Sequence, residues 1–227
     1  GEVLRFIPQE LQGPFLLGIA AVSVAIWAVL AERLRWASLG ILCALLMPAA
    51  GVVLLVSAHD YYHPAAHYGW LAWLAVFGVH FTSLRRLAAV VPGRVLSVAH
   101  VLGCWMLIGV LALELRYGLL LLSSEYNAWR WLGWAILPSL YLVLAAASRS
   151  WPWPVSAYPR EYRVLAALPL AALMFGWFWL ATIFSDGTAK PLPYVPLLNP
   201  LELGMLFALL GVYLCARSVA PQRGPRT

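Results

Sequence analysis

The chain has few charged residues. Only 11% of its 227 residues are Asp, Glu, Lys or Arg, whereas a soluble domain carries about 25%. With 63% apolar residues and a mean hydropathy of +0.82, the chain has too little polar surface to face water on all sides. This composition excludes an ordinary soluble domain and makes lipid the expected solvent.

Cysteine is scarce, and the common catalytic signatures are missing. Cys43, Cys104 and Cys215 all lie in apolar runs, which predicts core residues rather than a disulfide framework or metal cluster. No nucleotide-binding glycine loop, His-Glu-x-x-His, Gly-x-Ser-x-Gly or Cys-x-x-Cys is present, so the sequence names no cofactor. The formal net charge of +6 does not indicate a nucleic-acid partner, because the arginines stand singly or in pairs at the ends of apolar runs.

Long apolar runs dominate the chain, and a run needs about 20 residues to cross a bilayer. Seven runs qualify or nearly qualify: Pro14–Ala31, Trp36–Ala58, Tyr68–Leu84, Val95–Leu115, Ala128–Ser148, Val164–Phe184 and about Pro200–Ala216. They should be helices, since irregular backbone in lipid leaves amides without hydrogen bonds. Pro48, Pro138 and Pro169 predict kinks. The sequence therefore predicts an all-α, polytopic transmembrane bundle over residues 1–227, without a soluble domain.

The arginines set the expected orientation. Of the fifteen Lys and Arg residues, eleven fall on one side: Arg33, Arg35, Arg85, Arg86, Arg94, Arg149, Arg160, Arg163, Arg217, Arg223 and Arg226. The other side has Arg5, Arg116, Arg130 and Lys190. The positive-inside rule places the first side in the cytoplasm, the N-terminus outside and the C-terminus inside. We expect a multi-pass protein of the bacterial inner (cytoplasmic) membrane, in contact with membrane lipids.

Most carboxylates lie on the outer side. Seven of the nine are there: Glu2, Glu10, Asp60, Glu114, Glu125, Asp186 and Glu202. A chain that starts outside without a signal peptide is easier to understand if other helices come before it. We therefore expect upstream helices of the same protein, or a partner membrane protein, before Gly1.

Three histidines form a candidate metal site. His59, His63 and His67 recur every four residues beside Asp60, and on a continuous helix their imidazoles would align. Three imidazoles and a carboxylate suit zinc or another borderline metal. Pro64 disfavours helix at His63, and the alternative is an interfacial loop of polar aromatic residues.

Glu114 is a candidate catalytic carboxylate. It lies near the end of an apolar run and shares a helix face with Tyr117. A charge there is costly unless it is paired or hydrated. It would be a general acid or base, or else the partner of an arginine from another loop. Glu125 follows on the same side as a candidate substrate-binding residue.

The stretch from Asp186 to Glu202 is the most unusual in the chain. Asp186-Gly187 marks a turn, and four prolines within residues 191–200 forbid a regular helix. Asn199 and Pro200 then suit the N-cap and first position of a helix, with Glu202 in its first turn. The functional interpretation is a lid or re-entrant wall that lines a water-filled cavity on the outer face.

The residues proposed for that cavity come from several loops. The candidate catalytic residues are Glu114, Asp186 and Glu202. The candidate substrate-binding residues are Asp60, Glu125, Lys190, Tyr194 and Asn199. Inside the bilayer, His80 and His100 should lie at similar depth on neighbouring antiparallel helices. They are either functional intramembrane groups or histidines hydrogen-bonded to backbone carbonyls.

One segment carries a family resemblance. The run Leu192–Glu202, preceded by Ser185-Asp186-Gly187 and followed by an apolar helix, resembles the C-terminal part of a large bacterial family of predicted membrane proteins with a domain of unknown function. The step Trp151-Pro152-Trp153-Pro154 is similar to a feature between that family's helices. The resemblance implies a long inner-membrane protein with many more helices, of which this chain would be the C-terminal end. It brings no established reaction and assigns no catalytic residue.

The sequence favours one function over two others. The favoured function is an inner-membrane protein with a periplasm-facing polar cavity that binds or modifies a lipid-linked or glycan cell-envelope substrate. An enzyme of this kind would use a carboxylate as general base. The alternatives are a transporter or channel subunit and a structural scaffold within a larger membrane complex. A transporter needs polar residues through the bilayer, and the helix centres offer few of them.

Overall fold

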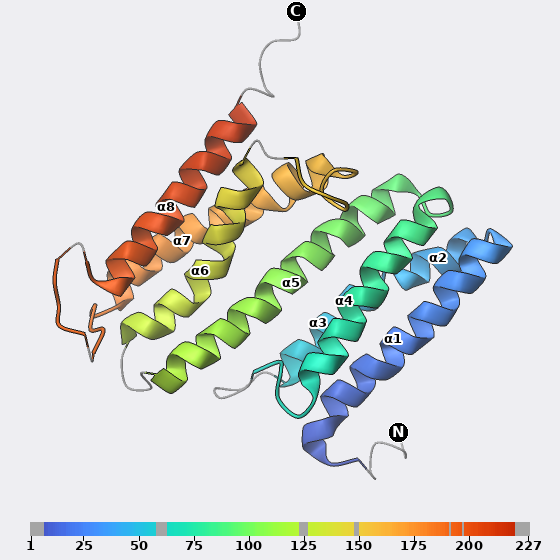
Figure 1. Cartoon of the computed structure of the whole chain (residues 1–227), viewed down its shortest axis with the longest axis horizontal. Helices are drawn as coiled ribbons and strands as arrows, with labels where there is room; N and C mark the ends of the chain where they lie inside the picture. Colours follow the sequence, from blue (N-terminus) through green and yellow to red (C-terminus); the bar gives the residue numbers. More distant parts are fainter. Residues whose placement is uncertain are drawn as a thin grey trace, which may run out of the picture. The chain divides into compact units, whose positions relative to one another are not determined.

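The computed structural model describes residues 7–57, 63–122, 127–147, 150–190, 192–196 and 198–220, and within these ranges it contains helices and no strand (Figure 1). The α-helices are α1 (Gln9–Leu34), α2 (Ala37–Cys43), α3 (Leu46–Ser57), α4 (Gly69–Arg86), α5 (Gly93–Leu122), α6 (Asn127–Ala146), α7 (Ala167–Phe184) and α8 (Pro200–Val219). A 3₁₀ turn, η2 (Leu87–Ala89), follows α4, and a π-helical turn, η3 (Glu161–Leu165), precedes α7. The predicted all-α architecture is confirmed.

Six segments of the described chain are long and apolar enough to cross a membrane. They are Gln9–Arg33, Ala37–Ser57, Gly93–Leu121, Ala128–Ala146, Glu161–Phe184 and Pro200–Val219. The remaining predicted run, Tyr68–Leu84, corresponds to α4. Its 18 residues include His80, Arg85 and Arg86, which makes it less apolar than the other six.

Proline explains two breaks in the helices. The second predicted run is divided into α2 and α3, with Pro48 in the first turn of α3. Pro48 has no N–H to donate to the carbonyl of Ala44, and its ring would clash with that carbonyl in a continuous helix. Pro169 likewise lies in the first turn of α7, directly after η3. The second predicted run is thus interrupted just before Pro48, one of the three positions where a kink is predicted, whereas α6 continues as one α-helix through Pro138.

The chain divides into two compact units, Gly1–Leu107 (unit 1) and Ile108–Thr227 (unit 2). In unit 1, α1 packs along α4 (Figure 1). The buried residues of α1 recur at intervals of three and four: Leu17, Ala21, Val24, Ala28 and Ala31. This spacing places them on one helix face. At one end of the pair, an Arg86 guanidinium nitrogen lies 3.0 Å from a Glu32 carboxylate oxygen.

In unit 2, α6 packs extensively along α8. The face of α8 that packs on α6 has small residues, including Gly204, Ala208 and Gly211. A Cβ at Gly211 would lie 3.1 Å from the carbonyl oxygen of Ser139, and a Cβ at Gly204 would clash with Leu132 Cδ1. Small residues allow two backbones to approach closely, which is how helices associate in lipid.

Large apolar side chains cover the outer faces of several helices. On α7 the exposed set is Leu168, Leu173, Phe175, Trp179, Leu180, Ile183 and Phe184. A monomeric soluble protein rarely exposes so large a contiguous apolar surface. These faces therefore suit contact with lipid tails.

Candidate functional site

Asn199 connects two parts of the segment between α7 and α8, residues 185–199 (the α7–α8 segment). Its side chain is only 2% exposed. Its Nδ2 donates a 2.7 Å hydrogen bond to the carbonyl oxygen of Gly187, and its Oδ1 accepts a 2.9 Å bond from the amide of Leu201. The second bond caps α8, with Pro200 at its first position and Glu202 in its first turn. The N-cap predicted at Asn199 is confirmed. The hydrogen bond from Asn199 to Gly187 is a further contact that the sequence did not predict.

The start of the α7–α8 segment forms the turn predicted at Asp186-Gly187. Asp186 Oδ1 accepts hydrogen bonds from the amide of Thr188 at 3.0 Å and from its hydroxyl at 2.9 Å. Gly187 has a φ of 72°, a left-handed conformation that is strained for residues with a Cβ. Asp186 thus stabilises the turn and stays exposed.

The same segment is bound to the start of α6. The amide of Ala128 donates to the carbonyl oxygen of Thr188 at 3.2 Å, which satisfies an N–H that the first turn of a helix leaves without a partner. The indole N–H of Trp129 donates to the carbonyl oxygen of Lys190 at 3.1 Å. Ala189, between them, is buried. The segment is therefore fixed over one end of unit 2.

Tyr194 and Glu202 join the segment to α8 by a side-chain contact. The Tyr194 hydroxyl donates a 2.9 Å hydrogen bond to Glu202 Oε1. This hydrogen bond, together with the negative charge of Glu202, raises the pKa of Tyr194. Tyr194 is 64% exposed, and Lys190 is also exposed. Two candidate substrate-binding side chains thus lie on the surface of this end of unit 2.

Glu114 lies within α5, because the helix continues to Leu122, beyond the predicted end at Leu115. It is half-buried. Two residues further on, the guanidinium of Arg116 lies 5.4 Å from the ring centroid of Trp134 on α6. Sequence reasoning missed this contact, because it joins two helices. Glu125 and Asp60 lie outside the described residues.

The histidine motif is only partly described, since His59 and Asp60 lie outside the described ranges. His63 and His67 lie before α4 rather than on a helix, and His67 has a φ of 48°. His67 Nδ1 is 3.3 Å from a carboxylate oxygen of Glu10. Over the described ranges, no group of three or more His, Cys, Asp or Glu side chains could hold a metal.

The two histidines that the sequence predicts within the bilayer, His80 and His100, are buried in unit 1. His80, which is 1% exposed, has its Nε2 3.1 Å from the carbonyl oxygen of Ala99. A Cβ at Gly103 would lie 2.6 Å from the same Nε2, so only glycine leaves room for this imidazole. His100 is fully buried. Of the two interpretations offered for His80, the structure shows the bond to a backbone carbonyl.

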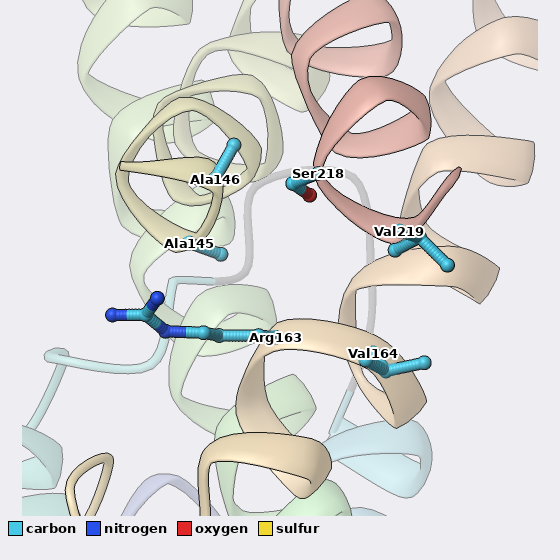
Figure 2. Close-up of a pocket in the computed structure, with 6 residues that line it drawn as sticks. All are labelled: Ala145, Ala146, Arg163, Val164, Ser218 and Val219. Carbon is cyan, nitrogen blue, oxygen red and sulfur yellow. The ribbon is translucent and has the colours of Figure 1, made fainter. Parts of the chain in front are cut away.

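A small pocket lies at the other end of unit 2 (Figure 2). It is lined by Ala145, Ala146, Arg163, Val164, Ser218 and Val219. Its volume is about 50 Å³, which holds a few water molecules rather than a substrate. The Ser218 hydroxyl donates to the carbonyl oxygen of Cys215 at 2.8 Å. Arg163 lies beside the C-terminal end of α6 (Figure 2), where an arginine complements helix carbonyls.

Comparison with known proteins gives one match. A family model described as "Predicted membrane protein (DUF2339)" matches residues 5–227. No curated protein and no solved structure matches the chain.

Proposed function

Because the chain belongs to the DUF2339 family of predicted membrane proteins, we propose that it binds the polar part of a cell-envelope substrate at the end of unit 2 that carries the α7–α8 segment. The observation that carries the proposal is the pair of hydrogen bonds made by Asn199. They hold the first turn of the segment, at Gly187, next to the start of α8. A binding surface that is already ordered loses less entropy when a ligand binds.

The charges of unit 2 support a periplasmic position for this end. The opposite end has Arg160, Arg163 and Arg217, as the positive-inside rule requires of a cytoplasmic face. The α7–α8 segment then faces the periplasm of the bacterial inner membrane. Substrates available there include glycans and lipid-linked precursors of the envelope.

The side chains at this end suit a ligand rich in hydroxyl groups. Exposed Asp186 and half-buried Glu202 offer carboxylate acceptors, and the exposed Tyr194 and Lys190 offer a hydroxyl and a cation. Carboxylates accept strong, charge-assisted hydrogen bonds from sugar hydroxyls. If the protein is also an enzyme, the same carboxylates are its candidate general bases, together with Glu114 on α5.

The test uses protein extracted from its own membrane into lipid nanodiscs. Co-purifying lipids and glycans are identified by mass spectrometry for the wild type and for Asp186→Asn, Tyr194→Phe and Glu202→Gln. We expect these variants to fold but to lose a bound envelope compound. Glu161→Gln removes a carboxylate at the opposite end of unit 2 and should keep the compound.

Two results would contradict the proposal. One is equal retention of the compound by Glu202→Gln and Glu161→Gln. The other is a partner protein that co-purifies stably while all three substitutions leave the bound compounds unchanged. A scaffold within a larger complex would behave in this way.

A further inference from the structure

Arg116 is fixed against α6 in two ways. A Cβ at Gly133 would lie 2.7 Å from Arg116 Cα, so α5 and α6 meet here only because residue 133 is glycine. The guanidinium of Arg116 stacks near Trp134, 5.4 Å from the ring centroid, a favourable cation–π geometry. The cation is thus held in place at the helix surface rather than free to rotate.

Arg130 lies on the same face of α6. It precedes Gly133 by three residues and Trp134 by four, and these spacings bring side chains onto one face, with Cβ atoms about 5–6 Å apart. Arg130 is exposed and Arg116 half-buried. Over the described part of the chain, neither guanidinium is in an ion pair. Both guanidinium groups therefore belong to the surroundings of Trp134: Arg116 by its contact with the ring and Arg130 by its place one turn earlier on α6. Two like charges beside one another repel, and an anion bound to both would remove that cost.

Both arginines lie near the ends of their helices. Arg130 is the fourth residue of α6, and Arg116 precedes the end of α5 at Leu122 by six residues. At about 1.5 Å per residue, they lie some 5 to 9 Å from the helix ends, which is roughly the depth of the head-group layer. The backbone of Lys190 is bound by Trp129, the neighbour of Arg130.

The outer side has few cations, and most of them belong to unit 2. Arg116, Arg130 and Lys190 are three of the four Lys and Arg residues that the orientation leaves there. All three belong to unit 2. The positive-inside rule disfavours cations at this position, so a cluster at one end of one unit is consistent with a specific anionic ligand.

The geometry points to a binding site for the phosphate group of a membrane lipid, formed by the guanidinium groups of Arg116 and Arg130 beside Trp134. A guanidinium presents two parallel N–H donors that match phosphate oxygens. The hydrocarbon chain of the lipid would occupy the same leaflet, next to the exposed ring of Trp134. This inference rests on the proposed function, because it names the substrate class for the same end of unit 2: a lipid-linked phosphate.

The experiment counts retained lipids by native mass spectrometry. The full chain is placed in nanodiscs of phosphatidylcholine with increasing phosphatidylglycerol. We expect Arg116→Gln and Arg130→Gln each to lower the apparent affinity for the most tightly held phosphatidylglycerol about tenfold, the effect of losing one strong, charge-assisted contact. Arg94→Gln, also exposed and at the opposite end of α5, should leave it unchanged. Arg116→Lys keeps the charge without the paired donors and should give an intermediate loss.

The remaining outcomes decide between ligand sources. Equal effects of Arg94→Gln and Arg130→Gln, or no effect of either arginine variant, would overturn the inference. If inorganic phosphate displaces the lipid at equal concentration, the ligand is a soluble anion and the lipid assignment is wrong. A cytoplasmic location of residue 190 would overturn the proposed function but not this inference. The number of phosphatidylglycerol molecules retained by each variant would still decide whether the phosphate site exists.

Discussion

The side-chain amide of Asn199 donates a 2.7 Å hydrogen bond to the carbonyl oxygen of Gly187, twelve residues earlier in the chain. This bond joins the first turn after α7 to the N-cap of α8. It closes the α7–α8 segment into a loop whose two ends are held together. The residue that caps the helix is therefore also the residue that shapes the candidate site.

Asn199→Ala should destabilise unit 2. The substitution removes the cap of α8 and leaves the half-buried Gly187 carbonyl without its donor, which together cost about 1–3 kcal/mol. Asn199→Asp keeps the acceptor for the Leu201 amide, but it places a carboxylate oxygen against the Gly187 carbonyl in a buried position, so it should not restore the lost stability. Thermal unfolding in detergent measures the stability of both variants. Thr82→Ala is the control, because the Thr82 hydroxyl donates to carbonyl oxygens within α4. Equal stability of Asn199→Ala and Thr82→Ala would refute this role.

Gly103→Ala should destabilise unit 1. The new methyl would lie 2.6 Å from the Nε2 of the buried His80, so the imidazole must move away from the Ala99 carbonyl. Overpacking of this kind costs about 1–3 kcal/mol. Gly109→Ala on the same helix has open space around it and should be neutral or slightly stabilising, because alanine favours helix over glycine.

A double-mutant cycle checks the cause of that loss. In a His80→Ala background the methyl at residue 103 has room, so most of the cost of Gly103→Ala should vanish. An unchanged cost would show that the strain comes from somewhere other than the imidazole.

Gly211→Leu should separate α8 from α6. Even a Cβ at this position lies 3.1 Å from the backbone carbonyl oxygen of Ser139, which cannot shift without moving α6. We expect a loss of at least about 1–3 kcal/mol, typical of overpacking, and a lower folded yield in detergent. Gly176→Leu on α7, where nothing lies within 4 Å of a Cβ, should keep the yield. Similar yields for the two variants would contradict the close packing of α6 and α8.

The hydrogen bond between Tyr194 and Glu202 gives a pH signature. Because it raises the pKa of Tyr194, its contribution to stability is present below the usual tyrosine pKa of about 10. That contribution is lost as the pH rises through the higher pKa of the folded protein. A pH titration of tyrosine absorbance, taken as the difference between wild type and Tyr194→Phe, isolates the ionisation of this phenol. In Glu202→Gln the midpoint of that ionisation should return toward about 10. A midpoint that Glu202→Gln leaves unchanged would contradict the contact.

The sequence predicted the helices well, because lipid requires long apolar runs and leaves few alternatives for the backbone. The N-cap at Asn199 followed from Asn and Pro at adjacent positions. The predicted end of α5 was wrong, because the predicted apolar run stops at Leu115 whereas the helix reaches Leu122. Polar residues near an interface lower hydropathy without ending a helix, so Glu114 and Arg116 were placed at an end instead of inside.

Long-range contacts account for what the sequence could not predict. The stacking of Arg116 on Trp134 and the fit of His80 against Gly103 depend on how two helices are rotated and aligned, which periodicity does not encode. The bond from Asn199 to Gly187 depends on how a proline-rich segment folds back. The histidine motif was ambiguous because Pro64 is compatible with a turn, and His63 and His67 do lie outside a helix.

The most direct test of the central claim is the side of the membrane on which the α7–α8 segment lies. The native thiols Cys43, Cys104 and Cys215 are buried, so a cysteine introduced at an exposed position should be the main reactive group. In spheroplasts treated with a membrane-impermeant maleimide, we predict that Lys190→Cys is labelled at once and Arg160→Cys only after lysis. Labelling of Arg160→Cys in intact spheroplasts, with Lys190→Cys protected until lysis, would contradict a periplasmic binding site.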